Sequence, residues 1–214
     1  MNHRLRFAVP AALIVLFVLP GCGTKRQTGI CGDLTAGDRM SGDADSFVAA
    51  GDTAWEGRRD VDQIQAAIDN WVKALRVDPS RAGVRVKLSR ARYLLADGHL
   101  GRNEENEEAT LASFDAGVRD AEHALAQLSS GYRDDFCAEK PFVDAIKKAD
   151  AGSVGAMYWY ATNLGKWGLA KGIFTILKYK DNIKAMMDRI VELDGTFFYH
   201  APYRYFGVYY TKIP

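Results

Sequence analysis

The chain has 214 residues, of which 28 are basic and 27 acidic, giving a formal net charge of +1. This balance provides no basic field to hold a nucleic acid, so we exclude that class of partner. The length is sufficient for one domain with a sizeable core, and 48% of the residues are hydrophobic.

The N-terminus has the pattern of a secretory signal peptide, because Arg4 and Arg6 precede an apolar run from Phe7 to Val18. The run is about a dozen residues long, whereas a membrane-spanning helix needs roughly 20. It ends at Leu19-Pro20-Gly21-Cys22, which resembles the lipobox of bacterial lipoproteins. We therefore expect a signal peptide over residues 1–21 and lipidation of Cys22. An ordinary signal peptide with an incidental cysteine is the alternative.

The stretch after Cys22 is rich in glycine, threonine and aspartate. It predicts a flexible tether over residues 22–41, followed by a helical-repeat domain over residues 42–214. We expect the lipid to hold the protein at the periplasmic face of a bacterial membrane, and Gly23 in place of an aspartate favours the outer membrane. Cleavage removes two basic residues and no acidic one, so the mature chain carries a formal charge of −1.

Two cysteines remain once Cys22 carries lipid, namely Cys31 and Cys137. Outside the cytoplasm such a pair is a possible disulfide. The alternative is two unlinked thiols, with Cys31 on the mobile leader and Cys137 in a loop. The sequence leaves both open.

Helical periodicity dominates the rest of the chain, and strand signals are almost absent. Asp43 or Asp45 can cap a first helix from about Ser46 to Glu56. A second helix, IQAAIDNWVKALRVDP, has to end before Pro79. A second pair of helices is predicted from about 84 to 96 and from about 106 to 128.

The third pair follows a predicted loop that holds Gly131, Cys137 and Pro141 and a short amphipathic segment, FVDAIKKA. Its helices contain YWYATNLGKW and IKAMMDRIVELDG. Three pairs are enough for a stacked solenoid. We therefore predict an all-α fold of tetratricopeptide-like helical hairpins in a short solenoid.

The last 18 residues, FFYHAPYRYFGVYYTKIP, hold eight of the 24 aromatic residues. If Pro202 begins a helix, where its missing N–H costs nothing, rings occupy both faces of that helix. A helix with rings on both faces cannot lie on the surface with only one face covered and the other in solvent. We expect it to close the end of the solenoid, with one stripe on the last hairpin and the other toward a cavity.

Two resemblances follow from these segments. Ala67, Trp71, Ala74 and Pro79 match the second helix of a tetratricopeptide repeat. The lipobox, the repeat GDTAWEGRRDVDQIQAAIDNWVKALRVDP, YWYATNLGKW and the terminal aromatic segment together resemble the TatT family, the periplasmic lipoprotein component of some TRAP transporters. That family usually has a glycine-rich turn before its terminal helix, whereas this chain has Tyr199-His200-Ala201-Pro202.

The TatT resemblance implies a lipid-anchored helical protein that docks a TRAP-type substrate-binding protein. It also implies passage of an apolar or amphipathic small-molecule solute through an internal cavity, and a homo-oligomer, plausibly a trimer. The rival function is a tetratricopeptide scaffold lipoprotein for envelope or pilus assembly. A closed cavity beside the terminal helix favours transport, and an open groove over a filled core favours the scaffold.

Several candidate cavity residues have structural alternatives. Asn163 either ties helices together or contacts ligand, and Trp159 and Trp167 belong either to the core or to the cavity. Arg204 pairs with a solute carboxylate, forms a salt bridge or stacks on a tyrosine, and His200 adds a titratable group if it points inward. The candidates are Trp159, Tyr160, Asn163, Trp167, Tyr199, His200, Tyr203, Arg204, Tyr205 and Tyr209.

Catalytic patterns are lacking in the sequence. His99, His123 and His200 are isolated, and neither GxSxG nor a phosphate-binding glycine loop occurs. We expect no enzymatic activity, no cofactor and no metal site.

Overall fold

The computed structural model describes residues 29–212, so the predicted signal peptide and Cys22 lie outside the described residues. Within that range the chain forms nine α-helices and no strand, which confirms the all-α prediction. Short π and 3₁₀ turns over residues 95–106 join the third helix to the fourth. The helices are α1 (Ala44–Glu56), α2 (Val61–Val77), α3 (Ala82–Leu94), α4 (Glu107–Leu128), α5 (Ser130–Cys137), α6 (Phe142–Ile146), α7 (Val154–Lys171), α8 (Ile173–Asp194) and α9 (Phe197–Lys212).

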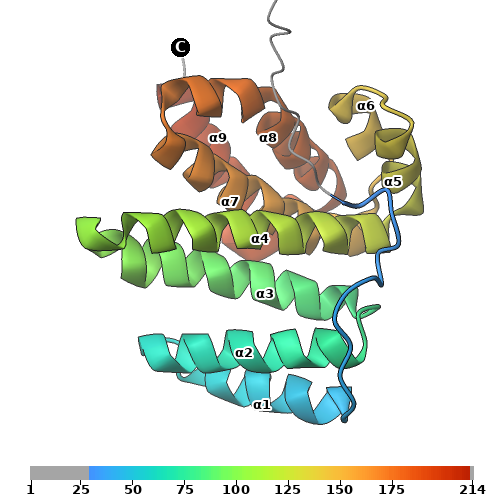
Figure 1. Ribbon diagram of the computed structural model, residues 1–214. Coiled ribbons are helices and arrows are strands. Elements are labelled where there is room, and N and C mark those ends of the chain that lie inside the picture. The colour runs from blue at the N-terminus through green and yellow to red at the C-terminus, as the bar shows by residue number, and fades with distance from the viewer. Residues whose placement is uncertain (1–28, 213–214) are drawn as a thin grey trace, which may run out of the picture.

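The helices stack as hairpins, and Figure 1 shows α1 and α2 at the bottom, α3 and α4 above them, and α7 and α8 at the top. Helix α2 packs on α3, and α4 packs on α7. Helices α5 and α6 lie to one side, and α9 runs behind α7 and packs on α8. The three predicted pairs are therefore present, while their tetratricopeptide character stays a prediction.

The first hairpin is closed by small residues. A Cβ atom on Gly51 would lie 2.5 Å from the ring of Trp71, so α1 and α2 approach too closely there for any side chain. Ala67 and Ala74 on α2 are fully buried. Trp71 is 2% exposed and donates from Nε1 to Asp52 at 3.1 Å. This hairpin therefore has a filled interface.

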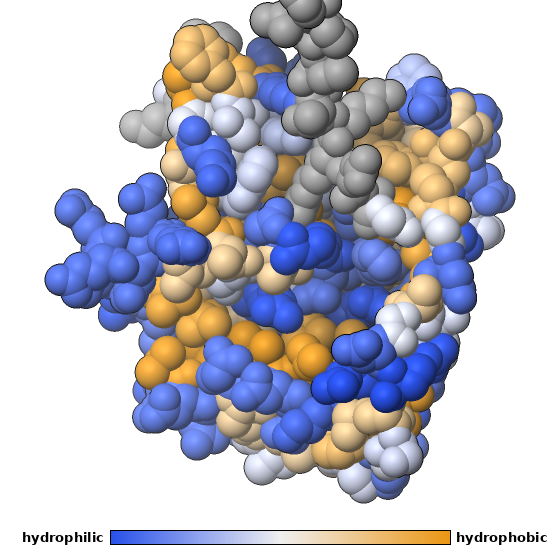
Figure 2. Space-filling view, in the orientation of Figure 1, coloured by the Kyte–Doolittle hydropathy of each residue, from blue (hydrophilic) through white to orange (hydrophobic). Residues whose placement is uncertain are grey.

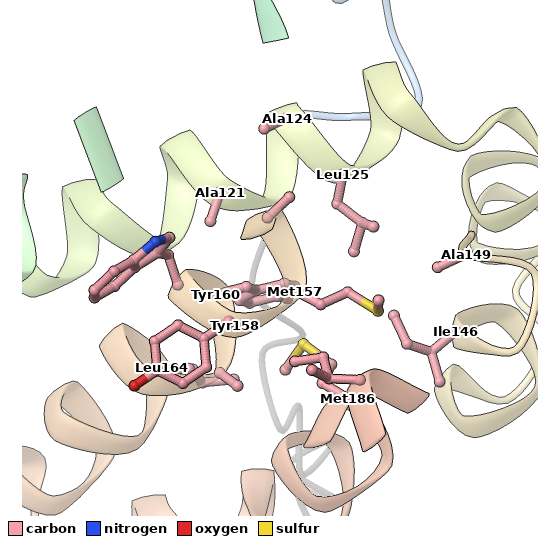
Figure 3. Packing of buried hydrophobic residues seen from close by; sticks show 14 of the residues in the cluster. Ala121, Ala124, Leu125, Ile146, Ala149, Met157, Tyr158, Tyr160, Leu164 and Met186 are labelled. Atoms are coloured by element: carbon pink, nitrogen blue, oxygen red, sulfur yellow. The ribbon is translucent and has the colours of Figure 1, made fainter. Parts of the chain in front are cut away.

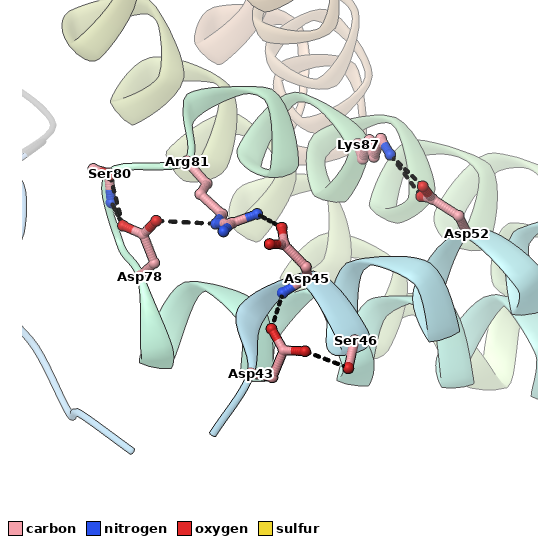
Figure 4. A network of polar contacts seen from close by, with 8 residues as sticks. All are labelled: Asp43, Asp45, Ser46, Asp52, Asp78, Ser80, Arg81 and Lys87. Atoms are coloured by element: carbon pink, nitrogen blue, oxygen red, sulfur yellow. Dashed lines mark hydrogen bonds and ion pairs between the residues drawn. The ribbon is translucent and has the colours of Figure 1, made fainter. Parts of the chain in front are cut away.

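Polar contacts join the first hairpin to the start of α3 (Figure 4). Asp43 caps α1 by accepting from the backbone N–H of Asp45. Arg81 pairs with Asp45 at 2.5 Å and with Asp78 at 3.0 Å, and Lys87 pairs with Asp52 at 2.6 Å. Exposed ion pairs contribute roughly 0–1 kcal/mol each, so they orient the hairpins more than they stabilise them.

The larger core lies among α4, α6, α7 and α8 (Figure 3). Leu125, Ile146, Met157 and Met186 converge there and are almost completely buried. Unbranched methionine side chains fill irregular gaps of this kind. The core under the last two hairpins is thus filled.

Residues 130–137 form helix α5 where we predicted a loop. Ser129 caps this helix by accepting from the backbone N–H of Tyr132 at 3.2 Å, and Tyr132 is fully buried. The segment is too short for a clear helical period, which is why the sequence pattern missed it.

Cys31 and Cys137 are bonded in the structure, with Cα atoms 5.5 Å apart. The alternative of two unlinked thiols is therefore wrong. The neighbouring Ile30 is fully buried, and Arg133 on α5 donates to the backbone carbonyls of Ile30 and Gly32. The described part of the predicted tether is therefore anchored to the domain at Ile30, Leu34 and the disulfide, while most of its other residues are exposed. It runs along the side of the stack from α5 down to α1 (Figure 1).

Candidate functional site

An apolar groove of about 480 Å³ lies between α7, α8 and α9 and is called the C-terminal groove below. It opens to solvent. None of the described residues that line it is acidic, and its basic residues are Lys166, Lys180 and Arg204. It therefore suits an apolar or amphipathic guest.

One face of each helix forms the walls of the C-terminal groove. Helix α7 contributes residues at i, i+3, i+4, i+7 and i+11 from Tyr158, which is the spacing of one helical face. The walls comprise Tyr158, Ala161, Thr162, Gly165 and Leu169 on α7, Ile173, Ile176, Leu177, Ile183 and Met187 on α8, and Ala201, Tyr205, Val208 and Tyr209 on α9.

A left-handed turn places α9 beside this groove. Phe198, Tyr199 and His200 have φ values of 47°, 59° and 58°, and none of them is glycine. Each such residue costs roughly 1–2 kcal/mol. The right-handed part of the helix starts directly after His200, consistent with the expected helix start near Pro202.

Arg204 holds this turn. Its guanidinium donates to the carbonyl of Phe198 at 3.1 Å and to the carbonyl of Tyr199. Charge-assisted bonds of this type are stronger than neutral ones. None of the three roles that we considered for Arg204 describes this arrangement, in which the side chain lines the groove and stabilises a strained backbone.

The turn is anchored by aromatic rings from other hairpins. Phe198 packs on Tyr158 and Trp159, with centroid distances of 5.7 and 5.4 Å. Arg90 of α3 lies over the rings of Trp55, Trp159 and Phe198 at 5.1, 5.7 and 5.3 Å. Burial, together with the charge of the nearby Arg58, lowers the pKa of Arg90. One cation thus connects the first hairpin, α7 and the start of α9.

Of the ten candidate residues, Arg204, Tyr205 and Tyr209 line the C-terminal groove. Burial raises the pKa of Tyr205 above its ordinary value, so its hydroxyl stays neutral at physiological pH. Tyr199 is 83% exposed, and His200 and Tyr203 are exposed as well. His200 therefore adds no titratable group to the groove.

Four candidates on α7 lie outside the groove. Trp159 and Tyr160 are buried, and Tyr160 donates to Glu122 at 2.9 Å. Trp167 is half-buried and packs on Tyr179 with ring centroids 6.1 Å apart. They belong to the opposite face of α7, which packs into the core.

Asn163, the fourth of these, ties three helices together. It is fully buried, and its Nδ2 donates to the backbone carbonyl of Ser89 at 3.2 Å, to Ser89 Oγ at 3.1 Å and to the carbonyl of Trp159 at 2.9 Å. A Cβ atom on Gly117 of α4 would lie 2.5 Å from Asn163 Oδ1, so only glycine fits there. These bonds agree with the alternative in which Asn163 ties helices together and does not contact a ligand.

Several groove residues were missed by reasoning from the sequence. Tyr158 was within the quoted YWYATNLGKW, and the α8 aliphatic residues were assigned only to a hairpin. The helical spacing of residues in α7 could have indicated these groove residues, because the face toward the groove is as regular as the face toward the core. Nothing in the period distinguishes the face that packs from the face that stays open.

A smaller hollow of about 340 Å³ lies between α6 and α8. Its walls carry charges of both signs, and two of the pairs are made within α8, Lys184 with Asp188 and Arg189 with Glu192, each at 2.8 Å. The charges are balanced locally, so this hollow is less suited to an apolar guest than the C-terminal groove.

Residues 29–212 contain no group of three histidine, cysteine or acidic side chains that could hold a metal ion. In the same range, no helix has the length and apolar character needed to cross a bilayer. A family model described as TAtT, TRAP transporter T-component, matches residues 95–214. This span contains every wall of the C-terminal groove except Tyr93. None of the curated proteins matches the chain.

Proposed function

Because the chain belongs to the TRAP transporter T-component family, we propose that it docks a TRAP-type substrate-binding protein and receives an apolar or amphipathic solute in the C-terminal groove. An accessory role in TRAP transport follows from the family. The observation that supports the finer proposal is the groove itself, with its apolar walls and no acidic lining residue in the described chain.

Solute binding would depend on exclusion of water. Burial of apolar surface contributes roughly 25 cal/mol per Å², and the aliphatic residues of α8 face the aromatic residues of α9 across the groove. Lys166 already pairs with Asp97 at 2.5 Å, and Arg204 is bonded to the turn. Lys180, at the groove wall, is then the cation best placed to orient a polar end of the solute.

The proposal includes a membrane anchor and an oligomer. Cys22 carries the lipid at the periplasmic face, with the outer membrane as the favoured site. The proposed homo-oligomer is a trimer, which would set several grooves side by side. Chemistry on the solute is not part of this function.

One specific observation favours the scaffold function by the criterion given above, and family membership is the reason that this function is ranked second. The core beneath the hairpins is filled, and the C-terminal groove opens to solvent instead of forming an enclosed cavity. A tetratricopeptide scaffold for envelope or pilus assembly would use such a groove to bind a peptide.

The partner is tested by a pull-down from periplasmic extract, with the mature chain carrying Cys22→Ser as bait and mass spectrometry as the readout. We expect recovery of an extracytoplasmic solute receptor. Recovery of envelope-assembly proteins without a receptor would instead favour the scaffold. The same bait with Tyr205→Ala should still recover the receptor if docking and solute binding use different surfaces.

A further inference from the structure

The turn between α7 and α8 exposes a cluster of large apolar side chains. Phe174 is 87% exposed, and Leu169, Ile173, Leu177 and the adjacent Val208 of α9 are between 45% and 62% exposed. We call these five residues the tip surface. Apolar atoms gather at this corner, at the upper left of Figure 2. Exposed apolar patches of this kind mark contact surfaces.

The tip surface sits on a tight, well-defined hairpin. Gly172 has a φ of 108°, in the left-handed region that glycine tolerates, and connects α7 directly to α8. A Cβ atom on Gly168 would lie 3.3 Å from the Cα atom of Ile176, so the two helices approach closely just behind the turn. The apolar side chains therefore project from a supported end of the stack.

The chain segment that forms the tip surface is basic, although one of its lysines, Lys166, is paired with Asp97 of the preceding hairpin at 2.5 Å. No aspartate or glutamate occurs between Asp150 and Asp181, whereas this segment contains four lysines, Lys166, Lys171, Lys178 and Lys180. An exposed apolar end next to basic residues is the pattern of a segment that enters the headgroup region of a bilayer with anionic lipids.

We propose that the tip surface inserts into an anionic lipid surface. This contact is separate from the lipid on Cys22 and independent of it. Apolar residues would enter about 5–10 Å into the interface, while the lysines would meet anionic headgroups.

A second copy of the chain is the less suitable occupant. In a symmetric dimer through the tip surface, the same four lysines would face one another, and like charges opposed across an interface are unfavourable. Anionic lipid, in contrast, complements them.

The proposal has a consequence for the groove. Leu169, Ile173, Leu177 and Val208 belong both to the tip surface and to the walls of the C-terminal groove. Insertion would therefore place one end of the groove against the bilayer, and an amphipathic solute would exchange between lipid and groove without crossing bulk water.

The test uses the mature chain with Cys22→Ser and vesicles of 30% phosphatidylglycerol in phosphatidylcholine, with pure phosphatidylcholine vesicles alongside. We expect co-sedimentation with the anionic vesicles. Phe174→Asp should weaken it by roughly tenfold or more, and Lys171→Glu by about fivefold or more. The matched control is Val61→Asp, at an exposed apolar position on α2, which should leave binding unchanged.

Three results would overturn the proposal. One is equal binding by the parent and the Phe174→Asp variant, and another is binding that ignores phosphatidylglycerol. The third is a parent protein that binds no vesicles, together with a Phe174→Asp variant whose oligomeric state, measured by light scattering, differs from that of the parent. This result would assign the tip surface to self-association. Phe174 does not line the C-terminal groove, so the Phe174→Asp variant should still bind a fluorescent amphiphile in that groove. Binding of the amphiphile therefore tests the proposed function separately from vesicle binding.

Discussion

The first and last hairpins of the stack are both pairs of antiparallel helices, but they differ in how closely their helices pack. Between α1 and α2, small residues such as Gly51 and Ala67 bring the helices together around the buried ring of Trp71. Between α7, α8 and α9, branched side chains meet tyrosines, and the left-handed turn sets α9 at a distance that leaves the C-terminal groove. The comparison indicates that one hairpin stabilises the fold while the other forms the wall of the proposed site.

The strongest way to break this comparison is Trp71→Ala. Removal of a fully packed tryptophan should lower the free energy of unfolding by about 3–5 kcal/mol. Per folded molecule, binding of a fluorescent fatty acid in the C-terminal groove should not change, because Trp71 lies in the other hairpin. Denaturant unfolding and fluorescence titration measure the two quantities. A loss of probe affinity by the folded fraction would contradict the separation.

Removal of the disulfide should have the next largest effect. Cys31→Ser opens a loop of 106 residues and should lower the free energy of unfolding by about 2–5 kcal/mol. Cys137→Ser is the matched variant and should give the same loss, as should reduction of the parent protein. Two variants with clearly different losses would show that packing near one of the cysteines, and not the crosslink, dominates.

Tyr205→Ala tests the last hairpin directly. It removes a groove wall and should weaken binding of the fluorescent fatty acid about tenfold, with a smaller effect on unfolding. Trp167→Ala is the control, because Trp167 is also a half-buried ring but lies outside the groove. If both variants lose affinity only in proportion to their unfolded fraction, Tyr205 is a structural residue and its ring is not part of the binding site.

The smallest expected effect concerns the left-handed turn at the start of α9. Tyr199→Gly should raise the free energy of unfolding by about 1 kcal/mol, because glycine adopts the left-handed region without strain. Tyr199 is largely exposed, so little packing is lost. Thermal unfolding measures the change, and Tyr203→Gly, within the right-handed part of α9, should destabilise instead. A loss with Tyr199→Gly would show that its ring contributes more than its backbone costs.

Much of the fold could be predicted because long helices repeat their signal. Helix α2 ends close to Pro79 as expected, and Asp43 caps α1 as one of the two candidates. Helix α5 was missed since eight residues hold little more than two turns, and its stability comes from burial of Tyr132. The disulfide depends on where two distant segments meet, which no local pattern reports.

The candidate site could be predicted only in part. The aromatic helix α9 was identified, and Tyr205 and Tyr209 do line the groove. On α7 we chose Tyr160, Asn163 and Trp167, yet the opposite face is the open one. Periodicity reports that two faces exist, while tertiary packing decides which of them is covered. The role of Arg204 was also beyond the sequence, because it depends on a left-handed backbone.

The bond between Cys31 and Cys137 also decides how the domain would bear a mechanical load. A pull on the chain ahead of Gly29 would pass through Cys31 into α5, which packs on α4 in the middle of the stack. Helices α1 and α2 follow Cys31 in the chain, so the disulfide gives the force a path to the centre of the stack that bypasses them. A protein tethered by its N-terminus would thus be suspended from its centre, and its first hairpin would stay relaxed when the tether is under tension.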